Sequence, residues 1–206
     1  MCPNDDVNEC KFPIGARATH YKNDSIVAEP GYFGVTLENG IRADMAVSEH
    51  AALFRFDFSA APSQNGTANP LVMLDLTDLW ASRQNASISV EAQEGSSTAR
   101  MRGNGTFLPS FGAGSYVLHF CLDLSGGAVK DSGVWVNDRA GASPKTLFVT
   151  RGFNLFYLQA GGFVRFQGPI AGPIVARIGL SCEWDASPDV CRIRDIEGAN
   201  VVLAQS

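Results

Sequence analysis

The sequence predicts an all-β fold made of antiparallel sheets, and three observations support this. Apolar and polar residues alternate with a period of two over many short runs, as they do on the two faces of a strand. Turn formers are abundant, with 21 Gly and 10 Pro among 206 residues. Helical periodicity is nearly absent, apart from one short turn expected over residues 76–82. Many short strands at regular spacing are typical of a two-sheet sandwich or a barrel.

The clearest local signal is a β-hairpin centred on Asn39-Gly40. Residues 32–38 and 41–48 both alternate apolar with polar side chains, and the Asn-Gly pair lies between them. A type I′ turn needs a positive φ at both central residues, which Asn and Gly tolerate best. We therefore predict two antiparallel strands joined by a type I′ turn.

The remaining strands are expected in order along the chain. Residues 52–58 place three Phe side chains on one face, and residues 71–76 form an apolar run interrupted only by Asp75, as in a strand covered on both faces. Residues 116–124 place five large side chains on one face, so a slip of one residue would expose all of them. An exposed loop is expected at 60–69. Weaker strands are expected at 88–90, 134–136, 147–150, 155–159, 163–166 and 174–180.

Charge and hydropathy exclude two classes of partner. The chain carries 16 basic and 21 acidic side chains, a net charge of −5, whereas a nucleic-acid binder needs a basic face. No uninterrupted apolar run reaches the roughly 18 residues that a membrane-spanning helix needs. We therefore expect neither a nucleic-acid nor a membrane partner, and a single domain is expected from the length.

The five cysteines suggest two local disulfides. Cys2 and Cys10 flank a turn-rich acidic segment, and Cys182 and Cys191 have the same separation. Disulfides within each of these two pairs would leave Cys121 unpaired. The alternative is five reduced thiols, because neither couple has the spacing of a metal-binding motif.

Four N-x-S/T sequons favour the secretory route over the cytosol. The candidate N-glycosylation sites are Asn23, Asn65, Asn85 and Asn104, and no proline blocks any of them. Disulfides would fit the same oxidising compartment. The N-terminus has neither the basic start nor the apolar core of a signal peptide, so we expect a fragment of a secreted protein.

Motifs of known catalytic and metal sites are absent from the sequence. The three histidines lie far apart and lack the spacing of a zinc site. There is no nucleophile elbow, P-loop or dinucleotide fingerprint. Asp75 and Asp78 could form an acid/base pair or bind calcium, but a turn-capping role or an ion pair with Arg83 is the favoured interpretation. No catalytic and no metal-ligating residue is therefore predicted.

Three aromatic residues are candidates for carbohydrate contact. Phe111 and Tyr116 lie among glycines, and Trp135 lies in an expected strand. An exposed aromatic ring can stack on the apolar C–H face of a sugar. The alternative is that these rings pack in the core, where most aromatic surface is buried.

Six segments together resemble fungal glycoside hydrolase family 92, and the resemblance extends from about Cys2 to Leu180. They are residues 2–13, 78–88, 104–121, 133–141, 145–157 and 159–166. The resemblance implies a secreted, calcium-dependent, inverting exo-α-mannosidase, in many members α-1,2-specific. It also implies that the N-terminal domain is a two-sheet sandwich of the galactose-mutarotase-like, carbohydrate-binding type. A larger helical domain would carry the acid, the base and the calcium ligands, with the active site at the junction.

The chain lacks two features that the family resemblance would imply, and their absence decides which role we expect for it. Nothing matches the family's upstream G-F-S-H-x-H-x-S-G-T-G stretch, and the helical domain is absent, so no catalytic residue is carried over. We expect a sandwich domain over residues 1–181 and an irregular tail over 182–206. Its expected role is a carbohydrate-binding, substrate-shaping domain without cofactor, inactive alone, with α-mannosides and the helical domain as partners. The alternative is a free-standing, secreted, lectin-like protein.

Overall fold

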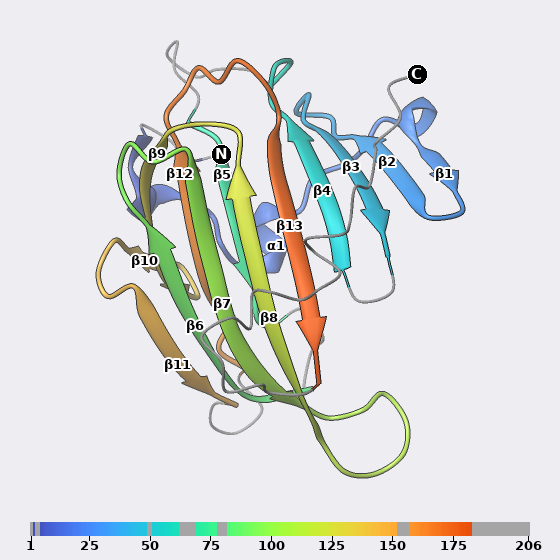
Figure 1. Ribbon diagram of the computed structural model, residues 1–206, viewed down its shortest axis with the longest axis vertical. Helices are drawn as coiled ribbons and strands as arrows, with labels where there is room; N and C mark the ends of the chain where they lie inside the picture. The colour runs from blue at the N-terminus through green and yellow to red at the C-terminus, as the bar shows by residue number, and fades with distance from the viewer. Residues whose placement is uncertain are drawn as a thin grey trace.

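The chain folds into two antiparallel β-sheets packed face to face. The computed structural model describes residues 2, 5–48, 51–61, 69–77, 82–151 and 157–182, and the two sheets overlap in the view of Figure 1. Within these residues, one sheet has nine strands and the other has four, and every strand pairing is antiparallel. The predicted all-β sandwich is confirmed.

The large sheet contains nine strands that come from most of the chain. They are β1 (Val27–Glu29), β2 (Tyr32–Thr36), β3 (Arg42–Val47), β4 (Ala51–Asp57), β6 (Arg83–Ala92), β7 (Thr98–Phe107), β8 (Tyr116–Ser125), β11 (Thr146–Thr150) and β13 (Ile174–Ser181). Their spatial order is β1-β2-β3-β4-β13-β8-β7-β6-β11, so β13 is inserted between β4 and β8.

The small sheet has the order β10-β9-β12-β5. Its strands are β5 (Leu71–Asp75), β9 (Val129–Val136), β10 (Arg139–Gly141) and β12 (Ala160–Phe166). Helical structure among the described residues is limited to three single turns: η2 (Val7–Glu9), α1 (Ile14–Arg17) and η3 (Asn23–Ser25). Within the described ranges, no helix is long and apolar enough to cross a membrane.

The hairpin predicted at Asn39-Gly40 is present, but its turn differs from the prediction. The Leu37 amide donates to the Ile41 carbonyl at 2.8 Å, so three residues form the loop. Gly40 alone in this loop has a positive φ, +84°, and a Cβ there would lie 2.2 Å from the Ala60 carbonyl oxygen. This is the arrangement of a three-residue hairpin with a left-handed glycine, so the type I′ prediction is wrong.

Strand β7 was not expected from the sequence, and its inward-facing positions explain why. Ala99 and Met101 point into the core, but Gly103 and Gly105 follow where large apolar residues would complete the pattern. A Cβ on Gly103 would lie 1.9 Å from the Ser87 carbonyl oxygen, so the close approach of β6 requires glycine there. The strand expected at 155–159 is wrong for residues 157–159, which are irregular, while 155–156 lie outside the described residues.

The main core lies between the two sheets. Its fully buried members come from both sheets, for example Met101 and Leu124 of the large sheet and Val164 and Phe166 of the small sheet. The alternation that the sequence shows is therefore the alternation between this core and the outer faces.

A second cluster lies on the outer face of the small sheet. Trp135 and Phe163 point away from the main core and are covered by Phe12 and Cys10. The ring of Phe12 stacks on Trp135 with centroids 5.5 Å apart and contacts Phe163 at 5.7 Å. Residues 5–17, here called the N-terminal strap, therefore cover this outer face, and all three rings are completely buried.

Polar contacts fix the N-terminal strap at both ends. Arg165 donates to the Asp5 carbonyl oxygen at 2.8 Å, and the Asp5 carboxylate also accepts from Lys130. Burial would raise the pKa of Asp5, but the hydrogen bonds and charges of its basic neighbours outweigh burial and lower that pKa. At the other end, Arg17 forms an ion pair with Asp75.

The cysteines agree with one predicted pair and differ from the other. Cys2 and Cys10 form a disulfide across eight residues, which closes the start of the strap. Cys182 is an exposed free thiol, so the predicted Cys182–Cys191 pair is not formed. Cys121, which the prediction left over, is disulfide-bonded. Its strand places it on the outer face of the large sheet, where it is 1% exposed. Cys191 lies outside the described residues.

The small sheet covers only part of the large one. One row of inward-facing residues crosses the large sheet at Leu124, Ala176, Phe54, Met45 and Phe33. Ala176 is 2% exposed, whereas Phe33 at the far end of the row is 39% exposed. Val47 on the same face of β3 is 54% exposed. The inner face of β2–β4 is therefore an uncovered apolar surface.

Candidate functional site

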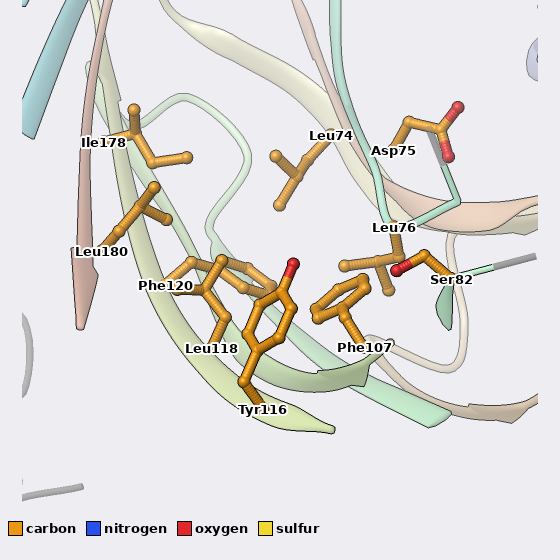
Figure 2. A pocket seen from close by; sticks show the side chains of 10 residues that line it. All are labelled: Leu74, Asp75, Leu76, Ser82, Phe107, Tyr116, Leu118, Phe120, Ile178 and Leu180. Carbon is orange, nitrogen blue, oxygen red and sulfur yellow. The ribbon is translucent and has the colours of Figure 1, made fainter. Parts of the chain in front are cut away.

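A pocket of about 260 Å³ opens between the two sheets (Figure 2). It lies at the end of the sandwich from which the β7–β8 loop projects in Figure 1. Strands of both sheets contribute to its wall. The lining side chains are Leu74, Asp75, Leu76, Ser82, Phe107, Tyr116, Leu118, Phe120, Ile178 and Leu180. This volume is just below the range of about 300–1,000 Å³ typical of ligand pockets, so a single ring is the largest group expected to enter.

Two stacked aromatic rings line the opening of the pocket. Phe107 and Tyr116 are the last cross-strand pair of β7 and β8, and their ring centroids lie 5.8 Å apart in a stacked arrangement. A Cβ on Gly105 would lie 2.6 Å from the Phe107 ring, so this glycine makes room for the stack. In Figure 2 the Tyr116 hydroxyl points into the pocket. Tyr116 is 42% exposed, and it is the one predicted carbohydrate-contact residue that lines the pocket.

The polar groups of the pocket lie at its rim and are mostly engaged. The Asp75 carboxylate accepts from the Thr77 amide at 2.7 Å and pairs with Arg17, and in Figure 2 it points away from the Tyr116 ring. The Ser82 hydroxyl donates to the Leu108 carbonyl at 2.6 Å. The wall is therefore largely apolar, which suits contact with a C–H face more than a dense hydrogen-bond network.

A buried arginine holds the strand ends beside this pocket. Arg83 is 1% exposed, and its guanidinium donates to the Thr77 hydroxyl and to the Leu158 carbonyl, both at 2.7 Å. Burial lowers the pKa of Arg83, while the charge of Asp75 acts in the opposite direction. The ion pair of Asp75 is made with Arg17 and not with Arg83 as the sequence suggested. Asp78, the other carboxylate considered, lies outside the described residues.

Phe111 lies on the β7–β8 loop and outside the pocket. The loop, residues 108–115, projects beyond the sheet in Figure 1. Phe111, in the middle of this loop along the sequence, is 89% exposed. Gly112 and Gly114 have φ values of +88° and +103°, which β-carbon-bearing residues rarely adopt. The structure therefore presents this ring to solvent, on the same loop that leads into Tyr116.

The prediction that Trp135 contacts carbohydrate is wrong, because its side chain is not accessible. It is completely buried in the cluster under the N-terminal strap, on the outer face of the small sheet. A sugar outside the folded chain cannot reach its ring. The sequence showed a strand, but it did not show that a segment more than 100 residues away would cover the outward face.

The structure places three of the four sequons. Asn23 is exposed in η3, whereas Asn85 and Asn104 are half-buried on the outer face of β6 and β7. Asn65 lies outside the described residues. Among the residues described, no group of three His, Cys, Asp or Glu side chains could hold a metal ion.

The chain matches the family model described as the glycosyl hydrolase family 92 N-terminal domain over residues 1–181. A protein from Arthroderma benhamiae named as an uncharacterized secreted glycosidase is 49% identical over 183 residues. That alignment covers 88% of this chain and 23% of the relative. The chain therefore spans less than a quarter of the length of this relative.

Two solved structures share the fold at low sequence identity. An inverting mannosidase of family 92 from Bacteroides thetaiotaomicron aligns with a TM-score of 0.67 at 16% identity, covering 94% of this chain and 23% of that one. The family 92 glycosyl hydrolase ccman5 aligns with a TM-score of 0.65 at 20% identity, covering 83% and 22% of the two chains. At these identities the likeness concerns the fold alone.

Proposed function

Because the chain belongs to glycosyl hydrolase family 92 as its N-terminal domain, we propose that it binds and shapes carbohydrate substrate for an α-mannosidase-like enzyme. The observation that carries the proposal is the pocket at the open end of the sandwich, whose mouth presents the stacked Phe107–Tyr116 pair. A mannosyl unit would place its apolar C–H face on Tyr116. Phe111, exposed on the adjoining loop, would contact a neighbouring sugar unit.

Because the pocket wall is apolar, we expect weak sugar binding with few hydrogen bonds to the sugar. Few free hydrogen-bond partners surround the Tyr116 ring, so the chain would hold a sugar by one stacking face and leave most hydroxyl groups to other partners. The proposed role is therefore orientation of the substrate, with the proton transfers supplied by another domain. Calcium-dependent release of mannose by this chain alone would contradict the proposal that another domain supplies the proton transfers.

The proposal includes a larger protein that passes through the secretory route. The relative named as a secreted glycosidase and the Cys2–Cys10 disulfide support that location. The length of that relative supports a further domain in the same chain. The whole protein would then bring a catalytic domain against this one.

We expect α-1,2-mannobiose to bind weakly, and the Tyr116→Ala variant to weaken binding at least about fivefold, since loss of a stacking ring removes roughly 1 kcal/mol. Isothermal titration at millimolar sugar measures this for the wild-type chain and the variant. Tyr21→Ala is the matched control, because Tyr21 is 50% exposed and does not line the pocket. Flat titrations with wild-type protein would contradict carbohydrate binding, and micromolar affinity would favour the free-standing lectin.

The uncovered apolar face of β2–β4 is the proposed contact surface for the rest of the protein. Phe33 and Val47 are exposed there beside the half-buried Met45 and Phe54. An isolated chain with such a patch is expected to self-associate, and Val47→Lys is expected to reduce this. Sedimentation velocity over a concentration series measures both. A wild-type chain that stays monomeric at high concentration would contradict the proposed surface.

A further inference from the structure

The outer face of the large sheet carries an exposed aromatic residue beside two sequons. Phe148 of β11 is 69% exposed, while Val149, which points to the core, is 5% exposed. A single exposed apolar side chain is common on protein surfaces and carries no argument alone. Phe148, however, lies on the same face of the sheet as Asn85 and Asn104.

The two sequons lie opposite each other on paired strands. Asn85 pairs with Thr106, and Ser87 pairs with Asn104, so the hydroxyl residue of each sequon faces the acceptor of the other. On the other side of β6, Ser87 pairs with Phe148. Phe148 is therefore the diagonal neighbour of Asn85 on the same face, with Cα atoms roughly 7–8 Å apart by sheet geometry. Asn104 is two strands away, at roughly 10 Å.

We propose that Asn85 is an N-glycosylation site whose first N-acetylglucosamine packs against the ring of Phe148. The pyranose C–H face and the aromatic ring are complementary, and a diagonal cross-strand neighbour is within reach of an aromatic side chain. The inference rests on the secretory part of the proposed function and is independent of carbohydrate binding at the pocket.

The attachment step is a glycosyl transfer by the transferase of the secretory pathway. The Asn85 amide nitrogen forms a bond to C1 of the sugar and loses one proton, which passes to a base of the transferase or to solvent. The bond between C1 and the pyrophosphate oxygen of a lipid-linked donor breaks, and the lipid pyrophosphate leaves with that electron pair. Nothing is oxidised or reduced.

The geometry favours Asn85 over Asn104 as the partner of Phe148. The Oδ1 atom of Asn104 accepts a hydrogen bond from the Ser87 hydroxyl at 3.2 Å, which holds that side chain against β6. Asn104 also pairs with His119, which is only 7% exposed. A glycan at Asn104 would begin farther from the ring and over a more enclosed part of the face.

The experiment compares the 206-residue chain made in a eukaryotic secretory host with the same chain made in bacteria. Peptide mass spectrometry after enzymatic release in heavy-oxygen water reports occupancy at each sequon. The Phe148→Ala variant is made in both hosts. It is expected to lower the Tm of the glycosylated chain by about 2–4 °C more than that of the bacterial chain. Trimming to a single N-acetylglucosamine should retain this difference.

Matched variants separate the glycan contact from a structural role of the residues. Asn85→Gln and Ser87→Ala both remove the sequon, and each should abolish the extra effect of Phe148→Ala, whereas Asn23→Gln should not. An unoccupied Asn85, or an equal effect of Phe148→Ala in both hosts, would overturn the proposal. Because the bacterial chain has no glycan, mannobiose titration on that sample tests the proposed function separately.

Discussion

Replacing Phe12 with alanine is expected to lower the free energy of unfolding by about 3–5 kcal/mol, the cost of removing a large ring from a packed core. Phe12 is completely buried, stacks on Trp135 at 5.5 Å and contacts Phe163 at 5.7 Å. Its backbone belongs to the N-terminal strap, so the cavity would open between this strap and the outer face of the small sheet.

Urea denaturation followed by circular dichroism and by tryptophan fluorescence measures this effect. The matched control is Phe111→Ala, which truncates the same side chain at a position that is 89% exposed and should change stability by at most about 0.5 kcal/mol. Equal stabilities of the two variants would contradict the role of the strap as part of the core.

Replacing Gly161 with valine is expected to cost about 3 kcal/mol, at the upper end of the usual range for overpacking. A Cβ at Gly161 would lie 1.8 Å from the Leu74 carbonyl oxygen and 2.8 Å from the Trp135 indole nitrogen. The first of these atoms is backbone in the paired strand β5, so it cannot rotate away. The small sheet would have to separate between β12 and β5.

Thermal unfolding of Gly161→Val, compared with Gly15→Ala, measures this cost. Gly15 lies in α1, and a Cβ there meets no atom within 4 Å, so alanine should stabilise the short helix slightly. A Gly161→Val chain with the wild-type Tm would show that the two strands are not packed as closely as described.

The strands with large apolar side chains on one face were predictable from the sequence. β4 and β8 each carry Phe or Leu at every second residue over part of their length, and this pattern is enough to predict both the strand and the side that faces the core. The alternation in β7 and at the start of β12 is interrupted by glycines. There the strand follows from the close approach of neighbouring backbones, which a single sequence does not display.

The candidate site was only partly predictable, because its parts meet through tertiary contacts. Tyr116 was selected as an aromatic residue next to glycines, and the structure places it in the wall of the pocket. Phe107, Leu118 and Ile178 were not selected, since the local sequence does not show that β7, β8 and β13 lie side by side and bring these residues together. Trp135 gave the same local signal as a surface aromatic residue and was wrong, because the distant N-terminal strap covers it.

The disulfides were also only partly predictable, because one of them depends on tertiary contacts. Equal spacing identified Cys2–Cys10 correctly, since eight residues of turn-rich chain can close on themselves. Equal spacing failed for Cys182, because the position of Cys121 on the outer face of β8 depends on the register of the large sheet. Local separation therefore predicts a disulfide only where the chain between the two cysteines makes its own turn.

Contact between a mannoside and Tyr116 at the open end of the sandwich can be located by NMR. The backbone and methyl signals of the chain would be followed during titration with α-1,2-mannobiose at millimolar concentration. We expect the largest shifts at Tyr116, Leu118 and Leu180, with smaller shifts at Phe111. Shifts confined to another face, or none at any concentration, would contradict it.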